Sequence, residues 1–375
     1  MKKISLGIDG RVLFRDNIRG IGRYLKNIIQ LAPKDFDVIV YGPKEYERFF
    51  NISVPTNVKI KTFDLKGYRI QSWEQIGLPF FMLYKRHDIL FCPANSAPLI
   101  QLCKTITTLH DAHLWLSDDD YGILRWYYKY LLPMAFRHLN YVITISEFSK
   151  KELLSIFPFL ENRIKVIYHG IEPVFKPEIC FDPDLIPNGI TIKKPYLFYI
   201  GGESPKKQPD FAIKLFLRVK KIWPNLSLLM LGISEEKRTL YSNKVKKDGI
   251  GSDIVVLPPI SDELLAMLYS NAEVVLYPTL HEGFGFPVLE AMASKVPILA
   301  SNVASIPEIS GGFAFLLPPT DVETWEETLR WIISHKNSML LKTKLENGHK
   351  WASAFSWNRT CEQTFDLFRN VRGVK

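Results

Sequence analysis

The hydrophobic pattern of the chain alternates between two kinds of segment. Short apolar runs, mostly β-branched or aromatic, are separated by stretches with the three-to-four-residue spacing of helices, such as 22–32 and 121–139. Nearly continuous apolar runs of this kind are typical of strands in a parallel sheet covered on both faces. Strand–helix alternation therefore predicts an α/β fold with doubly wound parallel sheets. The expected strands are 4–9, 38–42, 89–93, 105–110, 141–146, 164–170, 196–202, 226–232, 253–259, 273–278, 296–301 and 312–317.

This alternation is interrupted once. Residues 171–195 contain five prolines and little periodicity, which is typical of a linker. A chain of 375 residues also suits two domains of about 150–200 residues each. We expect an N-terminal domain over 1–175, a C-terminal domain over 176–355, and an amphipathic helix over 356–375 that docks on the N-terminal domain. In such sheets a ligand binds at the carboxyl ends of the strands.

Composition is that of a globular protein, with 47% hydrophobic and 23% charged residues. The net charge of +9 is uneven, because residues 1–175 hold 24 Lys and Arg against 17 Asp and Glu, and the remainder holds 24 against 22. A basic half favours an anionic partner. Without an RNP-type motif or Cys/His finger spacing, we expect no nucleic-acid partner. A solvated basic surface and an anionic membrane surface both remain open.

The cysteines and the N-terminus indicate the compartment. The four cysteines form no CxxC pair, which is typical of reduced core thiols in the cytosol. The N-terminal residues begin a strand without the apolar region of a signal peptide, and no stretch reaches the roughly 18 apolar residues that span a bilayer. The expected location is the cytoplasm, with peripheral attachment to the inner face of the membrane as an alternative.

The segment most informative about function is 279–309. A strand ends before a loop punctuated by Gly283 and Gly285, and Pro287 follows at a position that favours the start of a helix. Free N–H groups at a helix start form an anion site, and glycines let a ligand approach the backbone. Glu282 and Glu290 bracket this turn, and carboxylates suit paired sugar hydroxyls. The alternative is a strand–turn–helix corner whose glutamates are solvated.

Taken together, the loop, the proline, both glutamates and the following strand resemble a known family. The sequence EGFGFPVLEAMASKVP (282–297) is similar to the E-x7-E motif of glycosyltransferase family 4, the retaining GT-B glycosyltransferases, except that Lys295 stands where the family usually has glycine. Segments 7–29, 73–79, 108–115 and 143–153 resemble a bacterial branch that builds surface polysaccharides. So do 166–175, 199–216 and the region of Trp357.

The resemblance implies a GT-B fold, two Rossmann-like domains facing a cleft, and roles for residues of the motif. Glu290 matches the glutamate that holds the ribose hydroxyls of the nucleotide. Glu282 matches the residue that binds a hydroxyl of the transferred sugar and stabilises charge at its anomeric carbon. The backbone N–H groups of Phe284 and Gly285 are expected to meet sugar hydroxyls and phosphate oxygens.

A second segment of the C-terminal domain matches the family's phosphate contacts. Lys207 matches the lysine that neutralises the leaving diphosphate, with Lys206 beside it and Gly201 at the first glycine of the segment. The family often has arginine at the next position, where this chain has Gly202. Lys206 is one candidate to replace that phosphate contact, and Arg11 and Arg19 are the others. A solvated turn is the alternative for a lysine pair.

Three residues of the N-terminal domain are also implied in the site. Gly20 and Gly22 resemble the glycine loop that closes over the phosphate, although a tight turn before a helix explains them equally well. His110 matches a histidine that approaches the donor sugar; a buried structural histidine is the alternative. His110 and His113 also have the spacing of metal ligands, but no third ligand cluster stands out, so no metal site is expected.

The predicted activity is therefore retaining hexosyl transfer from a nucleotide diphosphate sugar, of the GDP-mannose or UDP-glucose type, without a cofactor. The acceptor would be a glycan or a lipid-linked sugar of polysaccharide biosynthesis. A GT-B nucleotide-sugar epimerase or hydrolase is one alternative, and an inactive sugar-nucleotide-binding scaffold is another.

Overall fold

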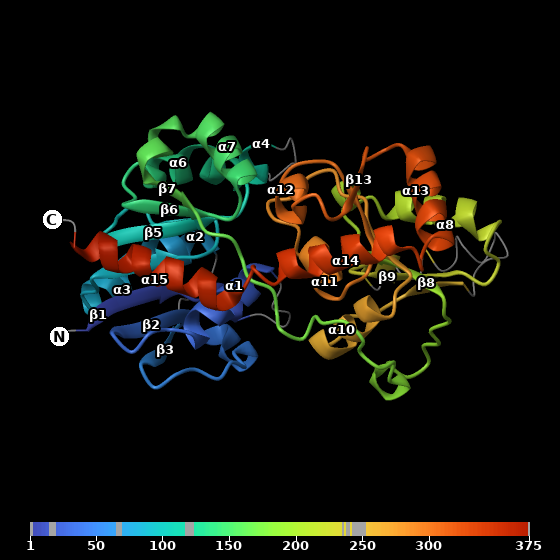
Figure 1. The fold of residues 1–375 in the computed structure, drawn as a ribbon. Coiled ribbons are helices and arrows are strands. Elements are labelled where there is room, and N and C mark those ends of the chain that lie inside the picture. The colour runs from blue at the N-terminus through green and yellow to red at the C-terminus, as the bar shows by residue number, and fades with distance from the viewer. Residues whose placement is uncertain are drawn as a thin grey trace. The chain divides into compact units, whose positions relative to one another are not determined.

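The computed structural model describes residues 3–14, 20–64, 70–116, 124–234, 236–237, 241 and 253–373. It divides the chain into two compact units (Figure 1). The N-terminal unit comprises Met1–Gly170 and Ser356–Lys375, and the C-terminal unit comprises Ile171–Phe355. The division after Gly170 lies five residues before the predicted domain boundary, so the proline-rich segment belongs to the C-terminal unit.

The N-terminal unit is built on a seven-stranded sheet in the order β3-β2-β1-β4-β5-β6-β7, with every pairing parallel. The strand register places Leu6 beside Val38 on one side and beside Ile89 on the other. The strands are β1 (Ile4–Asp9), β2 (Phe36–Pro43), β3 (Val58–Phe63), β4 (Ile89–Cys92), β5 (Lys104–Leu109), β6 (Tyr141–Thr144) and β7 (Ile164–Val166).

Helices cover both faces of this sheet. One face packs against α1 and α15, where Phe365 and Phe368 of α15 contact Phe36 and Phe91 of the sheet at ring-centroid distances of 4.8 and 5.1 Å. The helical segments are η1 (Arg11–Leu13), α1 (Gly20–Gln30), η2 (Lys44–Phe49), α2 (Ile70–Ser72), η3 (Trp73–Gly77), α3 (Leu78–Tyr84), α4 (His113–Leu116), α5 (Leu124–Trp126), η4 (Tyr127–Leu131), α6 (Leu132–Phe136), α7 (Glu147–Ile156), η5 (Pro158–Arg163) and α15 (Trp357–Gly373).

The C-terminal unit repeats this architecture with six strands in the order β10-β9-β8-β11-β12-β13, again all parallel. Its strands are β8 (Tyr196–Ile200), β9 (Ser227–Leu231), β10 (Ile254–Val256), β11 (Val274–Tyr277), β12 (Ile298–Ser301) and β13 (Phe315–Leu317). Its helical segments are η6 (Pro183–Leu185), η7 (Pro205–Lys207), α8 (Pro209–Lys220), α10 (Asp262–Ser270), α11 (Phe286–Ala293), α12 (Ile306–Ser310), α13 (Val322–Ser334) and α14 (Met339–Ala352).

The predicted fold class of two doubly wound parallel-sheet domains is confirmed. One strand was missed, because β3 lies at the sheet edge and alternates apolar Val58 and Ile60 with Lys59 and Lys61. Only one face of an edge strand of this kind needs to be apolar, so it lacks the continuous apolar run of its neighbours. The predicted helix over 121–139 is interrupted, since π-helical η4 separates α5 from α6.

Two further expectations concern the cysteines and membrane-spanning segments. Cys92 and Cys361 are buried thiols as predicted, whereas Cys180 is exposed and is not a core thiol. Among the described residues, no helix has the length and apolar character needed to cross a membrane.

Candidate active site

The loop between β11 and α11 carries most of the predicted motif. Gly285 caps α11 with a φ of 103°, a conformation that strains any residue with a side chain. A Cβ at this position would also lie 2.6 Å from Cδ1 of Ile306. The hydroxyl of Ser305 donates to the carbonyl oxygens of Glu282 and Phe284, both at 2.9 Å. The loop conformation is therefore fixed by its own glycine and by α12.

Lys207 and Glu282 form an ion pair in this loop region. Lys207 Nζ contacts Glu282 Oε1 and also donates to the hydroxyl of Tyr277 at 3.3 Å. The hydroxyl of Thr279 donates to the same carboxylate oxygen at 3.0 Å. The Lys207 and Glu282 side chains are 18% and 15% exposed, so a ligand can reach both. The structure thus brings the two predicted catalytic residues of the C-terminal unit into direct contact.

Hydrogen bonds fix the loop after β8 and join it to the loop after β11. The N–H of Leu280 donates to the carbonyl oxygen of Lys206 at 2.7 Å. The hydroxyl of Tyr199 donates to the carbonyl oxygens of Gly202 and Lys207, at 2.7 and 3.1 Å. Both loops follow the carboxyl ends of neighbouring strands, β8 and β11, which is the expected ligand edge of such a sheet.

Glu290 lies on α11 and is buried, with 3% of its surface exposed. Its Oε2 accepts a hydrogen bond from the hydroxyl of Tyr269 at 2.8 Å. The charges of both motif carboxylates affect the pKa of the buried Tyr277. Burial first, and then the charges of Glu282 and Glu290, hold its pKa well above the usual range. The Tyr277 hydroxyl therefore stays protonated.

The local backbone at Gly202 favours glycine. Gly202 has a φ of 99°, and Gly232 beside it has a φ of 93°. A Cβ on Gly232 would lie 2.9 Å from the backbone of Gly202, so the two segments touch through glycine. Gly201 is equally confined, because a Cβ there would meet the Tyr199 hydroxyl at 2.9 Å. A long side chain does not suit this local backbone.

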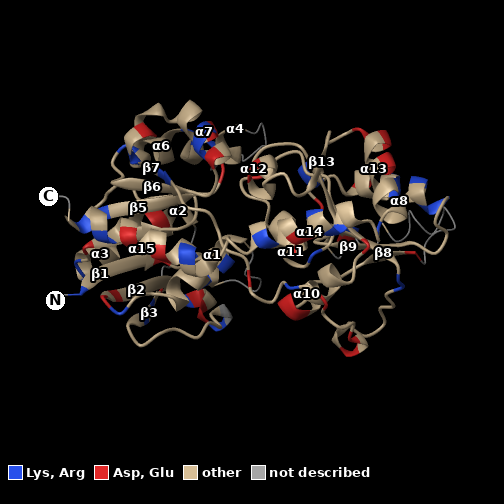
Figure 2. Ribbon diagram, in the orientation of Figure 1, with Lys and Arg blue, Asp and Glu red and all other residues tan. Residues whose placement is uncertain are grey.

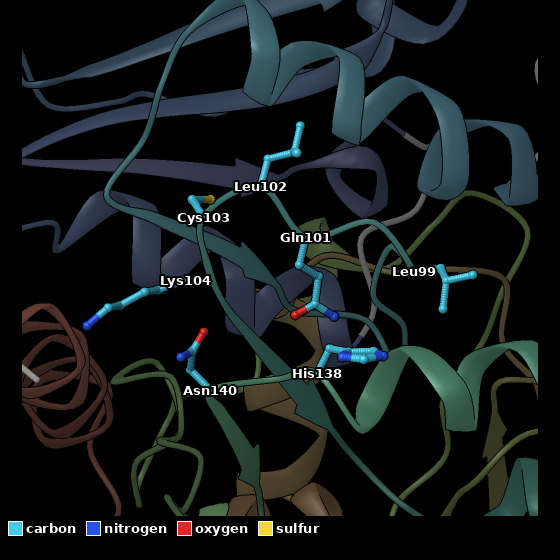
Figure 3. Close-up of a pocket in the computed structure, with 7 residues that line it drawn as sticks. All are labelled: Leu99, Gln101, Leu102, Cys103, Lys104, His138 and Asn140. Atoms are coloured by element: carbon cyan, nitrogen blue, oxygen red, sulfur yellow. The ribbon is translucent and has the colours of Figure 1, made fainter. Parts of the chain in front are cut away.

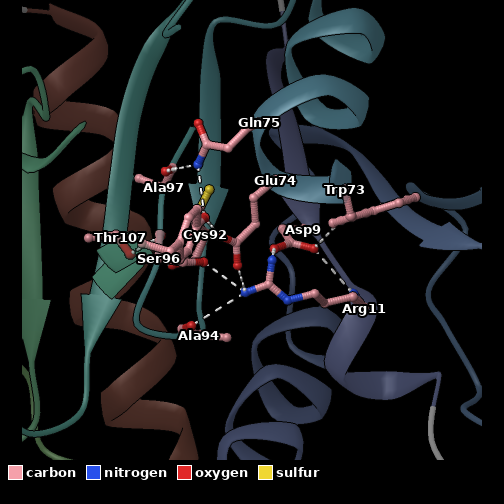
Figure 4. Close-up of polar contacts among 11 residues, drawn as sticks. Asp9, Arg11, Trp73, Glu74, Gln75, Cys92, Ala94, Ser96, Ala97 and Thr107 are labelled. Carbon is pink, nitrogen blue, oxygen red and sulfur yellow. Dashed lines mark hydrogen bonds and ion pairs between the residues drawn. The ribbon is translucent and has the colours of Figure 1, made fainter. Parts of the chain in front are cut away.

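Of the three candidates for the missing phosphate contact, Arg11 is already paired. Its guanidinium forms ion pairs with Asp9 at 2.8 Å and Glu74 at 2.6 Å and donates to Ser96 Oγ at 2.7 Å (Figure 4). Arg19 lies outside the described residues. The Lys206 side chain is half-buried, and within the part of the chain that the structure describes its Nζ makes no ion pair.

The Arg11 cluster is a buried ionic network that sequence reasoning missed. Asp9 also accepts from the indole of Trp73 at 2.9 Å, and Glu74 accepts from the hydroxyl of Tyr127. Burial is the main influence on the Glu74 carboxyl and raises its pKa, although the Arg11 charge opposes the shift. The signal was present in the sequence as an Asp, an Arg and a Glu within otherwise apolar segments, 4–14 and 73–82.

The two N-terminal glycines are placed differently from the expectation. Gly20 and Gly22 form the first turn of α1 and not a loop. The helical pattern of 22–32 thus extends two residues further toward the N-terminus, and the predicted place of these two glycines beside the phosphate stays a prediction. The preceding residues 15–19 lie outside the described part of the chain.

His110 follows β5 and is buried in the N-terminal unit. Its Nε2 lies 2.8 Å from the carbonyl oxygen of Pro93, which can only accept, so Nε2 carries the proton. Its Nδ1 then accepts from Nε2 of His169 at 3.4 Å. Burial lowers the pKa of His110 and lowers that of His169 further. Both imidazoles are therefore neutral near pH 7, and His110 is a hydrogen-bonding group here.

The predicted residues therefore divide between the units. The C-terminal unit brings together Gly201, Lys206, Lys207, Glu282, Phe284, Gly285 and Glu290 around the β8 and β11 edge. The N-terminal unit holds Gly20, Gly22 and His110. Figure 2 shows that Lys and Arg are distributed over both units.

Two family models match consecutive parts of the chain. The model described as Glycosyltransferase Family 4 matches residues 18–175, and Glycosyl transferases group 1 matches residues 184–349. The chain belongs to glycosyltransferase family 4. A family relative, the O-antigen chain mannosyltransferase RfbU of Salmonella typhimurium, is 26% identical over 305 residues, covering 79% of this chain and 80% of the relative.

Solved structures place this family 4 chain among GT-B folds. The sucrose-phosphate synthase of Thermosynechococcus elongatus superposes with a TM-score of 0.76 at 17% identity, covering 98% of this chain and 99% of that one. HepE of Anabaena, solved with UDP and glucose, gives a TM-score of 0.72 at 17% identity, covering 98% of this chain and all of that one. At this identity the likeness establishes the fold, and the expected GT-B class is confirmed.

Proposed function

We propose that this family 4 glycosyltransferase moves a hexosyl group from a nucleotide diphosphate sugar to a glycan or lipid-linked acceptor, with retention at the anomeric carbon. The observation that carries the proposal is the cluster of Lys207, Glu282 and Tyr277 at the carboxyl edge of the C-terminal sheet, with Glu290 behind it. It combines an accessible cation with carboxylates in the loops where a doubly wound sheet binds its ligand.

In this proposal the donor displaces the internal ion pair. Lys207 leaves Glu282 and binds the diphosphate. The released Glu282 carboxylate then accepts a hydrogen bond from a hydroxyl of the transferred sugar. The Glu290 carboxylate accepts hydrogen bonds from the ribose hydroxyls, while the hydrogen bond from Tyr269 fixes its orientation. The N–H groups of Phe284 and Gly285 at the start of α11 donate to sugar hydroxyls and phosphate oxygens.

The chemical step needs stabilisation of the departing diphosphate. Lys207 supplies one positive charge, and we assign the contact of the missing family arginine to Lys206, whose charge, among the described residues, is not paired with Asp or Glu as that of Arg11 is. Cations fixed at the developing negative charge stabilise the transition state without reorganising. We propose that no divalent metal is required and that the diphosphate itself accepts the proton of the acceptor hydroxyl.

We propose a donor of the GDP-mannose or UDP-glucose type and a role in polysaccharide biosynthesis. The mannosyltransferase name of the Salmonella relative supports the first sugar, and the UDP and glucose bound to HepE support the second. We further propose that the enzyme works in the cytoplasm, attached peripherally to the inner face of the cell membrane, where lipid-linked acceptors are accessible.

The test is a transfer assay with labelled nucleotide sugars and a membrane lipid extract containing lipid-linked acceptors. The expected result is acceptor-dependent incorporation of label, with the anomeric configuration of the donor retained in the product by NMR. Donor turnover of equal rate without acceptor would favour an epimerase or hydrolase instead. Donor binding without turnover under any acceptor condition would favour a scaffold. An inverted product would contradict the proposed mechanism.

A further inference from the structure

Exposed apolar side chains gather on the N-terminal unit in a way that its folding does not explain. Leu83, Tyr84 and Trp126 are 69%, 72% and 61% exposed. The aromatic side chains of the stretch 121–139 therefore have two different environments: Phe136 is in the core, whereas Trp126 and Tyr130 face solvent. We define the apolar face as Ile76, Phe80, Leu83, Tyr84, Ile100, Leu102, Trp126, Tyr130 and Met134.

The helical segments that carry these side chains cover the same face of the sheet. Cys92 of β4 is in register with Thr107 of β5, which is in register with Val142 of β6, so the three side chains point to one side. Cys92 packs in the cluster of α3, and Val142 packs in the cluster of α6. The segments η3–α3 and α5–η4–α6 are therefore neighbours on that face, opposite α1 and α15.

Polar contacts join the two helical segments and the loop between them. Gln75 of η3 donates to the Tyr127 hydroxyl of η4 at 3.0 Å and accepts from the N–H of Leu99 at 2.8 Å. Gln101 donates to the carbonyl oxygen of Ala135 in α6 at 2.9 Å. Together with the contact of Tyr127 to the buried Glu74, these bonds make the apolar face one fixed surface.

A shallow hollow opens beside the same loop (Figure 3). It has a volume of about 490 Å³ and is lined by Leu99, Leu102, Lys104 and His138 among others. Because Lys104 begins β5 and Asn140 precedes β6, the hollow lies at the amino ends of the strands. Arg11 follows the carboxyl end of β1, so the hollow lies at the other ends of the strands and does not belong to the candidate active site.

The segments that carry the apolar face have an excess of basic residues. Segments 70–86, 97–104 and 124–139 contain six Lys and Arg residues and one acidic residue, the buried Glu74. Arg86, Arg125 and Lys129 are exposed, and Lys129 lies over the Tyr130 ring at 5.9 Å. Exposed aromatic rings flanked by cations, without an accessible carboxylate in these segments, match an anionic lipid surface.

We propose that the apolar face docks on an anionic phospholipid bilayer, with its aromatic rings in the headgroup layer and Arg86, Arg125 and Lys129 at lipid phosphates. The proposal deepens the proposed function in one respect, since it presents the N-terminal unit to a lipid-linked acceptor. Docking itself needs neither donor nor acceptor. The attachment is reversible and weakens as salt rises, because surface charges are screened.

Vesicle flotation tests the proposal with the full chain and phosphatidylcholine vesicles, with and without phosphatidylglycerol. The protein is expected to float with the anionic vesicles at low salt and to be released at high salt. Neutralising Arg125→Gln and Lys129→Gln together should weaken partitioning about 25-fold, at roughly fivefold for each cation. Phe80→Ser with Trp126→Ser should weaken it by at least about tenfold.

The C-terminal unit offers matched controls. Lys214→Gln with Lys342→Gln removes the same charge from exposed positions, and Met339→Ser with Leu340→Ser removes exposed apolar side chains. Both control pairs should partition like the parent protein. Equal partitioning of the face variants and the controls would overturn the proposal, as would failure of the parent to float at low salt.

A second measurement tests whether the apolar face is instead an interface between copies of the chain. Light scattering that finds a dimer in the parent and a monomer in the Phe80→Ser, Trp126→Ser variant would assign the face to self-association and overturn the membrane proposal. Calorimetric binding of the nucleotide sugar should be unchanged in all face variants. Loss of flotation with intact donor binding in the face variants would therefore affect the membrane proposal alone. A parent protein that floats but binds no nucleotide sugar would contradict the proposed function alone.

Discussion

Replacing Lys207 by methionine removes the one charge that the proposed mechanism needs most. In the free protein the change breaks the pair with Glu282, whose carboxylate keeps the Thr279 hydroxyl and some access to solvent. We expect a loss of about 1 kcal/mol in the free energy of unfolding, because an ion pair that is partly exposed is screened. The folded protein should therefore remain available for kinetics.

The effect on catalysis should be much larger than the effect on stability. A fixed charge or donor at a developing anion contributes about 3–4 kcal/mol to the transition state, so kcat/KM of Lys207→Met should fall about 100- to 1000-fold. Lys207→Arg keeps the charge but changes its shape and reach, so it should recover at least about tenfold of the lost activity. The assay is initial transfer rate against donor concentration.

The matched control is Lys214→Met, which removes the same charge from an exposed position on α8. It should retain the parent kcat/KM. If kcat/KM of Lys207→Met stays within about threefold of the parent value, Lys207 does not stabilise the leaving group and the mechanism is refuted.

Three further predictions concern the donor site, the metal and pH. Glu290→Ala should weaken nucleotide-sugar binding by calorimetry without unfolding the protein, and equal affinity would remove Glu290 from the ribose site. Activity should persist in excess EDTA, whereas a loss restored by manganese or magnesium would indicate a metal-dependent step. Burial lowers the pKa of His87 from 6.5 to about 4, so the unfolded chain binds more protons between these values and stability falls as pH falls. Protonation of His87 alone should lower the free energy of unfolding by about 2 kcal/mol between about pH 7 and about pH 5, as measured by denaturant unfolding. A free energy of unfolding that does not change over this pH range would contradict the neutral buried state of His87.

The parts of the fold that sequence predicted well are those with a local signal. Buried parallel strands such as 196–200 and 274–277 are continuous apolar runs, so their positions could be read directly. β3 could not, because an edge strand has only one apolar face and reads as a polar segment. The break at η4 was also hidden, since a π-helical turn leaves the apolar spacing of 121–139 almost unchanged.

The candidate site divides in the same way. The strand–glycine–proline pattern around Gly285 predicted the loop and the start of α11, because each step has a local physical cause. The partnership of Glu290 with Tyr269, from a different helix, depends on tertiary packing and left no sequence signal. The pairing of Arg11 with Glu74 joins residues 63 positions apart, so only the structure could withdraw Arg11 from the phosphate site.

The central claim is that the C-terminal unit binds a nucleotide diphosphate sugar at Lys207, Glu282 and Glu290. A thermal-unfolding screen of the parent protein against GDP, UDP, ADP and dTDP sugars tests it most directly, with the same screen on Glu290→Ala and Lys207→Met. One base should raise the melting temperature of the parent, because a ligand at about 100 times its Kd stabilises the folded state by about 2.7 kcal/mol. Both variants should lose most of that shift. No shift with any of the four bases, or the same shift in the parent and both variants, would contradict the account.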